Sequence, residues 1–297
     1  MTIAFGDSER HILALFKPGE RFTHQQSEYC VRISGKPVVA HGEPKTDIYV
    51  RAVSSAGEKE FKISFKRENA NFLENKISSE RASQLFGADW ARIIHTATSS
   101  IKDAFAEKPL IYKSNYGKTE AGAITLGWKF ELLNVKSGHL SGEIPLSHNQ
   151  LVDVYAGTNL AEEKKDAAVN DIIIRNSGVA NYILFESVVP SNIQEAADML
   201  IPISEYADAN PHIYFACKAL NFRSFRQKYD GNRPLAVYVD WGVCDGRLSS
   251  RLIYGDPLQH GGDWACARLL NALRSIGAVT TDDLNSSNVA DIRLIAF

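Results

Sequence analysis

The chain has 297 residues, of which 44% are hydrophobic and 23% charged, and its formal net charge is −2. This length and apolar content predict a sizeable core, and the charge balance alone gives no support for nucleic-acid binding. No apolar run reaches the roughly 20 residues of a membrane-spanning helix, and the first residues lack a signal-peptide pattern. We therefore expect a cytoplasmic protein without membrane contact.

The cysteines favour the same compartment. Cys30, Cys217, Cys244 and Cys266 lie far apart and form neither a CxxC pair nor a zinc-like spacing. This pattern predicts reduced, mostly buried thiols, as in cytosolic proteins.

The first half of the chain predicts a helical start, a hairpin and a long helical region. Weak helical patterning before residue 34 is interrupted at Pro18-Gly19. Residues 44–66 hold two alternating apolar–polar runs around a polar turn, which is typical of a β-hairpin. Residues 78–107 repeat apolar side chains at steps of three and four, which predicts helix. We expect Ser78 to cap this helix, and Gly87 with Asp89 to divide it, Asp89 capping the second part.

The second half predicts mostly strands. Residues 123–135 favour a strand pair, and later strands are expected within 180–189, 212–220, 235–243, 247–255 and 290–297, with helices near 193–200 and 263–277. The simplest interpretation is an α/β (α+β) fold in a single domain covering residues 1–297.

Alternation sets the faces of the predicted hairpin. Successive strand residues point to opposite faces, so a turn centred on residues 55–58 places both apolar sets on one face by pairing Ile48 with Phe65 and Val50 with Ile63. The same register pairs Asp47 with Lys66. Burial alone therefore predicts a carboxylate beside an ammonium at the open end of the hairpin.

A second carboxylate, Glu80, lies in the first turn of the helix that follows. One interpretation is structural: the Asp47–Lys66 pair is a surface ion pair of little energetic value, and Glu80 interacts with the helix dipole. The other is chemical. Two carboxylates with nearby carbonyls suit Mg²⁺, and a lysine beside them can orient or deprotonate an attacking water.

These residues resemble the PD-(D/E)xK nuclease superfamily, which includes most type II restriction endonucleases and has a mixed sheet flanked by helices. Its motif is an Asp at the start of one strand and (D/E)-x-K on its neighbour. Here Asp47 is followed by Ser64-Phe65-Lys66, with Ser64 in place of the acid. One restriction-enzyme subgroup shows this replacement and carries a Glu on the next helix; here 13 residues separate Lys66 from Glu80.

The resemblance implies a set of site residues. Asp47 and Glu80 would bind one or two Mg²⁺ ions, the carbonyl of Phe65 would be a further ligand, and Lys66 would be the catalytic lysine beside Ser64. Glu28 is the candidate for an additional acid on an N-terminal helix, although a solvated carboxylate is the alternative. Glu60 is a weaker choice of acid because we expect it to lie in the turn.

Two segments predict DNA contacts. A glycine-containing loop and the densest basic cluster of the chain carry basic, amide and aromatic side chains that suit phosphates and base edges: Lys113, Asn115, Tyr116, Lys118, Arg223, Arg226 and Lys228. For each, a solvated surface is the alternative. The catalytic core would cover about residues 20–135 plus later strands, and 110–175 and 210–270 would serve DNA recognition or dimerisation.

The expected function is that of a Mg²⁺-dependent endodeoxyribonuclease acting on double-stranded DNA, a type II restriction endonuclease that works as a homodimer or higher homo-oligomer. Two alternatives stay open. One is a structure-specific, repair or phage nuclease of the same fold. The other is a non-enzymatic binding or assembly protein in which Asp47 and Lys66 form only an ion pair.

Overall fold

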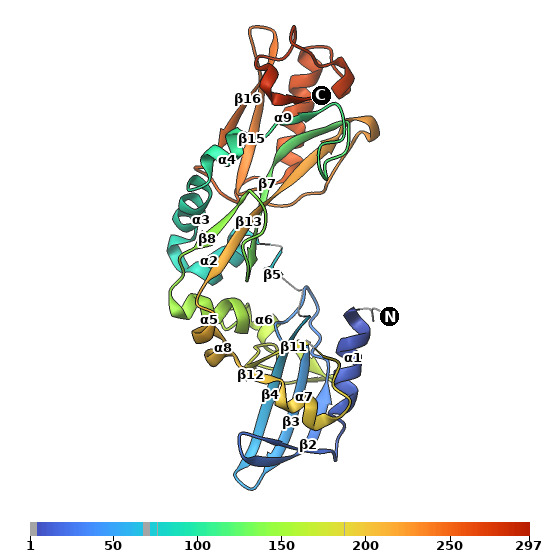
Figure 1. Ribbon diagram of the computed structural model, residues 1–297, viewed down its shortest axis with the longest axis vertical. Helices are drawn as coiled ribbons and strands as arrows, with labels where there is room; N and C mark the ends of the chain where they lie inside the picture. Colours follow the sequence, from blue (N-terminus) through green and yellow to red (C-terminus); the bar gives the residue numbers. More distant parts are fainter. Residues whose placement is uncertain (1–4, 68–71, 76, 187) are drawn as a thin grey trace. The chain divides into compact units, whose positions relative to one another are not determined.

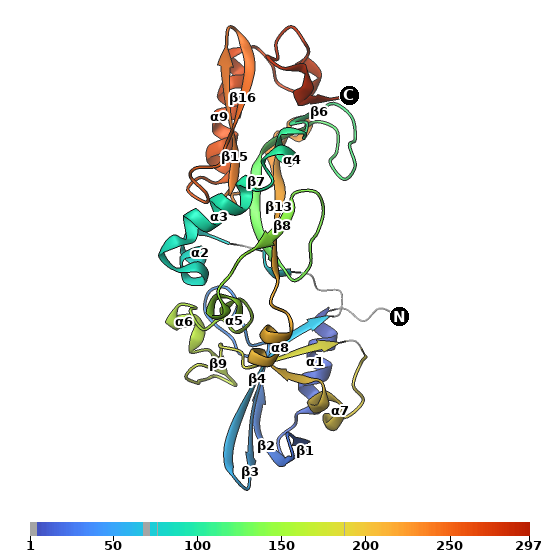
Figure 2. The same cartoon turned by 60° about the vertical axis from the view of Figure 1, so that its left-hand side comes forward.

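The computed structural model describes residues 5–67, 72–75, 77–186 and 188–297. These residues form a mixed α+β fold with curled, mostly antiparallel sheets flanked by helices, which confirms the predicted class (Figures 1 and 2). Contacts divide the chain into two compact units. Unit 1 takes Met1–Asn71 and Leu146–Pro211, and unit 2 takes Phe72–Pro145 and His212–Phe297. A single nuclease domain and a restriction-endonuclease-like core both stay predictions.

Unit 1 is built on a six-stranded mixed sheet. Its strand order is β1-β2-β3-β4-β11-β12, and all neighbours are antiparallel except β4 and β11, which run parallel. The strands are β1 (Arg21–His24), β2 (Ser27–Gly35), β3 (Ile48–Ser54), β4 (Gly57–Arg67), β11 (Tyr182–Glu186) and β12 (Leu200–Pro202).

One face of this sheet carries the core of unit 1. Phe61, Ile63 and Phe65 alternate along β4 and are fully buried, because strand alternation places all three on the same side. Helices α1 (Phe5–Leu15) and α7 (Ile193–Asp198) contribute to the same apolar cluster. Burying these side chains drives folding at about 25 cal/mol per Å² of apolar surface.

The remaining elements of unit 1 are short. They are α5 (His148–Ala156), α6 (Glu162–Lys165), the ribbon β9 (Ala168–Val169) and β10 (Ile172–Ile173), and α8 (Ile203–Ala209). The ring of Tyr206 on α8 contacts the rings of Tyr155 on α5 and Phe185 on β11. These contacts attach α5 and α8 to the sheet.

Unit 2 is built on a second, curled sheet in the order β14-β13-β7-β15-β16, to which short strands attach at β7 and β13. Its strands are β5 (Phe72–Glu74), β6 (Ile111–Tyr112), β7 (Ala123–Leu133), β8 (Ser141–Ile144), β13 (Ile213–Arg223), β14 (Lys228–Tyr229), β15 (Val237–Cys244), β16 (Arg247–Ile253) and β17 (Ile295–Ala296). The stacked rings of Phe130 and Phe215 join β7 to β13.

The helices of unit 2 follow the predicted pattern in part, because the predicted helical region also breaks between Ser99 and Lys102 and Asp89 does not cap its second part. They are α2 (Ser79–Phe86), η1 (Gly87–Asp89), α3 (Trp90–Ser99), α4 (Lys102–Ala106), η2 (Ser224–Arg226), α9 (Gly262–Ser275), η3 (Thr281–Asp283) and η4 (Ile292–Leu294). Ser78 caps α2 by accepting the N–H of Arg81, as predicted. Asp89 caps nothing with its side chain, which instead pairs with Arg92. No helix of the described residues is long and apolar enough to cross a membrane.

The predicted strand pair within residues 123–135 is wrong. Residues Ala123–Leu133 form one continuous strand, β7, and Gly127 lies inside it rather than in a turn. A Cβ atom at Gly127 would lie 2.6 Å from the carbonyl oxygen of Val237 and 2.8 Å from the Cα of Tyr238. The glycine therefore allows β15 to approach β7 closely.

Gly127→Ala is expected to destabilise the protein by about 1–3 kcal/mol because its methyl group collides with the β15 backbone. Equilibrium denaturant unfolding, followed by the fluorescence of the unit 2 tryptophans, measures this change. Gly255→Ala is the control, since a Cβ there meets nothing within 4 Å. Equal stabilities of the two variants would contradict the close approach.

Candidate active site in unit 1

The β3–β4 hairpin forms as predicted, but its register is shifted by two residues. Ile48 pairs with Ile63 and Val50 with Phe61, whereas the sequence predicted Ile48 opposite Phe65. The turn falls at residues 55–56 because the Ser54 hydroxyl accepts the N–H of Ala56 at 3.2 Å and Gly57 adopts a φ of 120°. A shift of two residues keeps every side chain on its predicted face.

The corrected register changes the partner of Asp47. Its N–H donates to the carbonyl of Ile63 at 2.8 Å, and its Oδ2 accepts the N–H of Phe65 at 2.7 Å. Continuing the pairing of Ile48 with Ile63 by one residue sets Asp47 across from Ser64 rather than Lys66. Asp47 therefore stands opposite the first position of the Ser-x-Lys sequence, and Lys66 follows on the same face as Ser64.

The Asp47 carboxylate is electrostatically unusual. Burial raises its pKa to about 6, the nearby Lys66 ammonium and the Phe65 N–H oppose this rise, Glu9 adds to it and Lys36 lowers it. Asp47 is half-buried, and two lysines and a second carboxylate influence its charge. Such an environment is typical of a site that binds a cation or transfers a proton.

Glu9 and Lys36 were not predicted from the sequence. Glu9 lies on α1 with only 6% of its surface exposed, and its Oε1 accepts a hydrogen bond from Lys36 Nζ at 2.7 Å. One feature of the sequence could have indicated Glu9. It lies one helical turn before Ile12, so its carboxylate is on the buried face of α1.

Glu28 does not lie on a helix. It belongs to β2, is exposed, and contacts Arg21 at 3.5 Å. Gln25 and Gln26 both adopt positive φ values, of 48° and 65°, and form the two-residue turn between β1 and β2. The predicted helical placement was wrong because this turn carries none of the usual Asn-Gly or Asp-Gly residues.

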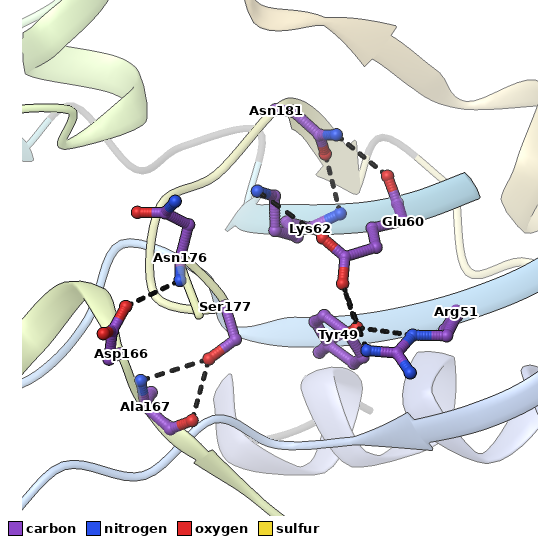
Figure 3. A network of polar contacts seen from close by, with 9 residues as sticks. All are labelled: Tyr49, Arg51, Glu60, Lys62, Asp166, Ala167, Asn176, Ser177 and Asn181. Carbon is purple, nitrogen blue, oxygen red and sulfur yellow. Dashed lines mark hydrogen bonds and ion pairs between the residues drawn. The ribbon is translucent and has the colours of Figure 1, made fainter. Parts of the chain in front are cut away.

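Glu60 does not lie where the sequence predicted it. Glu60 is the fourth residue of β4, opposite Arg51, and not part of the turn. Figure 3 shows its carboxylate between three side chains. It accepts a hydrogen bond from the Tyr49 hydroxyl, and lies 3.4 Å from Arg51 Nη2 and 3.9 Å from Lys62 Nζ. With three cationic or donor partners, this carboxylate has the contacts of a structural residue.

The same network shifts two further pKa values. Burial lowers the pKa of Lys62, against the effect of Glu60. Burial and the hydrogen bond to Glu60 raise the pKa of Tyr49 to about 12. Tyr49 therefore stays protonated and can only donate to Glu60. Figure 3 also shows the Ser177 hydroxyl, which accepts the N–H of Ala167 and donates to its carbonyl.

Asn181 extends the edge of β4 with its side chain. Its Oδ1 accepts the N–H of Lys62 at 2.7 Å and its Nδ2 donates to the carbonyl of Glu60 at 2.9 Å (Figure 3). An amide side chain thus replaces a stretch of strand backbone just before β11 begins. This contact fixes where β11 joins β4.

Asn181→Ala is expected to reduce the hydrogen-exchange protection of the Lys62 amide by roughly 10-fold, because the loss of one hydrogen bond costs about 1 kcal/mol. NMR-detected exchange measures this effect residue by residue. Asn181→Asp is the matched control, since it keeps the acceptor for Lys62 and loses only the donor to Glu60. Unchanged protection in Asn181→Ala would contradict the bridging role.

Glu80 and Asp47 belong to different units. Glu80 is exposed in the first turn of α2, which belongs to unit 2. Between Lys66 and Ser78, residues 68–71 and 76 lie outside the described residues, and the relative positions of the two units are not determined. The role of Glu80 therefore stays a prediction.

The predicted DNA-binding residues all lie in unit 2. Some of their side chains bond to other parts of the protein, and others are exposed to solvent. Lys113 Nζ donates to the carbonyl of Leu284 at 2.8 Å, and Asn115 Oδ1 accepts the N–H of Ala121 at 2.9 Å. These two side chains hold their own loop in place. Tyr116, Lys118, Arg226 and Lys228 are exposed, whereas Arg223 is half-buried.

No protein-family model, curated protein or solved structure matches the chain. Within the described ranges, no three His, Cys, Asp or Glu side chains gather in a way that could hold a metal ion. The function therefore has to be argued from the arrangement of Asp47, Lys66 and their neighbours.

Proposed function

We propose that the protein is a Mg²⁺-dependent endodeoxyribonuclease that hydrolyses phosphodiester bonds in double-stranded DNA, with a PD-(D/E)xK-type site of the Ser-x-Lys variety. One observation carries the proposal. Asp47 lies across from Ser64 at the open end of the β3–β4 hairpin, with Lys66 close enough to influence its pKa. Asp47 is half-buried, whereas a simple surface ion pair would leave its carboxylate in water.

The donors in unit 1 fit a hard divalent cation. Among the described residues, the Asp47 Oδ1 atom accepts no hydrogen bond, while Oδ2 is held by Phe65. Glu9 supplies a second carboxylate from α1. Oxygen ligands of this kind are those that Mg²⁺ prefers, and a cation would also relieve the cost of burying the Asp47 charge.

In the proposed site each residue has one role. Asp47 binds the ion, with the carbonyl of Phe65 as a further candidate ligand, and a role for Glu80 stays a prediction from the spacing of the sequence. Mg²⁺ would stabilise the charge that develops on the scissile phosphate. The Lys66 ammonium orients the attacking water, and the neutral Ser64 leaves room for the ion beside Asp47.

Glu9 takes the place that the sequence analysis gave to Glu28 as the acid from the N-terminal helix. Its partner Lys36 neutralises it in the absence of a cation. The proposed reaction is thus assembled around α1, β3 and β4, all of which belong to unit 1.

The proposal extends to partners and role. Cleavage of both strands of a two-fold symmetric site would need a homodimer or higher homo-oligomer, and a type II restriction endonuclease in the cytoplasm is the role most consistent with the resemblance. A structure-specific nuclease of the same fold would use the same residues and prefer branched DNA.

Cleavage of supercoiled plasmid and long linear DNA tests this proposal, with Mg²⁺ and with EDTA. Discrete fragments that disappear in EDTA are the expected result, and mapping their ends would give the recognition site. Nicking or smearing with the same metal dependence would keep the chemistry and change the role. Absence of cleavage on linear, supercoiled and branched substrates would overturn the proposal and favour a binding or assembly protein.

A further inference from the structure

Two loops of unit 2 meet at one end of the β7–β13 pair. Ala123, the first residue of β7, pairs with Arg223, the last of β13, so the loop that precedes β7 and the turn that follows β13 are neighbours (Figure 1). Together they line a pocket of about 450 Å³ whose walls include Glu120, Arg226 and Lys228. The pocket thus joins the two segments predicted to contact DNA.

Arg223 is the scaffold of this pocket. Its Nε and Nη2 contact the two carboxylate oxygens of Asp230 at 3.0 and 3.1 Å, and its Nη1 lies 3.1 Å from Glu120 Oε1. This bidentate pairing is strong and geometrically fixed. Arg223 therefore orients both carboxylates, and a contact of Arg223 with phosphate stays a prediction.

Glu120 and Arg226 form the part of the pocket that faces outward. The second oxygen of Glu120, Oε2, lies 3.3 Å from Arg226 Nη2. The Arg226 side chain is 70% exposed, compared with 24% for Arg223. A carboxylate has about four lone-pair sites and a guanidinium has five N–H donors. Both groups can therefore accept or donate further hydrogen bonds while they remain paired.

The two carboxylates decide what such a pocket can bind. Glu120 and Asp230 offset two of the three cationic side chains that line the pocket, so it is a weaker clamp for the DNA backbone than its cations alone suggest. Base edges in the major groove present both donors and acceptors. Arginine pairs with O6 and N7 of guanine, and a carboxylate accepts from N4 of cytosine. A single G·C base pair offers both of these groups next to each other.

We propose that the Glu120–Arg226 pair reads a G·C base pair in the major groove of the substrate, with Arg226 donating to guanine and Glu120 accepting from cytosine. This inference rests on the proposed function for its ligand, double-stranded DNA. The exposed Lys118 and Lys228, on the two loops that form the pocket, supply the phosphate contacts that carry no sequence information.

Selection from a pool of duplexes with a randomised centre tests the inference. The selection is run in Mg²⁺ in a Lys66→Ala background, so that bound duplexes stay intact, and is repeated with Glu120→Gln and Arg226→Lys added. The parent is expected to enrich a motif with a fixed G·C pair. Both variants should reduce the preference at that one position by roughly 10- to 100-fold, because glutamine no longer supplies a carboxylate and lysine cannot bond guanine bidentately.

Asp89→Asn is the matched control. It removes a carboxylate from another exposed ion pair of unit 2, that of Asp89 with Arg92, and should leave the selected motif unchanged. A motif that Glu120→Gln and Arg226→Lys also leave unchanged would overturn the inference. So would a pool in which the parent enriches no motif at all.

The two proposals fail separately. Cleavage of plasmid by the wild-type protein in Mg²⁺, together with selection that yields no motif, would overturn base reading by Glu120 and Arg226 and leave the nuclease standing. A selected G·C motif without cleavage of any DNA would overturn the nuclease and leave base reading standing.

Discussion

Replacement of Lys66 with alanine is expected to reduce Mg²⁺-dependent DNA cleavage by roughly 10²- to 10⁴-fold, the range found when a group that assists proton transfer is removed. The physical reason is the place of Lys66, two residues after the serine that faces Asp47, where its ammonium can hold the attacking water. Single-turnover cleavage rates measure the loss, with the fold checked by circular dichroism.

Lys62→Ala is the matched control for this prediction. Lys62 lies on the same strand and the same face as Lys66, but its ammonium lies beside Glu60 rather than Asp47. We expect its cleavage rate to stay within a few-fold of wild type. The reverse order of effects would transfer the catalytic role to the Glu60-Phe61-Lys62 sequence and contradict the assignment of Lys66.

Asp47→Asn is expected to stabilise the protein at alkaline pH. The native pKa of Asp47, raised from 3.8 to about 6, means that the folded state holds this proton more tightly than the unfolded state does. Wild-type protein therefore loses stability as pH rises from about 4 to about 7, and the loss is complete above this window. Asparagine carries no charge, so the variant does not lose this stability. Its free energy of unfolding at pH 8 should exceed that of wild type by about 2–3 kcal/mol.

Denaturant unfolding at pH 3.5 and pH 8 measures this difference. The stabilisation by Asp47→Asn should be present at pH 8 and absent at pH 3.5. Asp291→Asn serves as the control, because the Arg293 guanidinium lowers the pKa of the Asp291 carboxyl. Removing this carboxylate should not stabilise the protein at pH 8. A variant at Asp47 that is less stable than wild type at pH 8 would contradict the raised pKa of this carboxyl group.

The faces of the β3–β4 hairpin could be predicted because alternation decides them. Ile48, Val50, Phe61 and Ile63 all lie on the core side as expected. The register could not be predicted to better than two residues, because a shift of two preserves every face. The choice depends on a local detail, the turn formed by Ser54 with Ala56 and Gly57.

The candidate site was predictable only where it lies on that hairpin. Asp47, Ser64 and Lys66 are at its open end as expected. Glu9 and Lys36 were missed because their contact with each other and their influence on Asp47 join segments far apart in the chain. Long-range pairing of this kind leaves no local pattern, and a carboxylate on the buried face of α1 was the one sign of it.

The DNA-binding prediction shows the same limit. The basic residues could be counted from the sequence, but the sequence does not show which carboxylates pair with them. Arg223 counts as a cation in the sequence and is occupied by Asp230 and Glu120 in the fold. Which cations remain available is decided by tertiary contacts.

Cleavage of supercoiled plasmid by wild-type protein and by Asp47→Asn, side by side in Mg²⁺ at pH 8, tests the central claim most directly. The wild type should linearise or fragment the plasmid, and the variant should leave it intact although it is the more stable protein. Equal cleavage by both proteins, or none by the wild type, would contradict a metal-dependent phosphodiester hydrolase centred on Asp47 and Lys66.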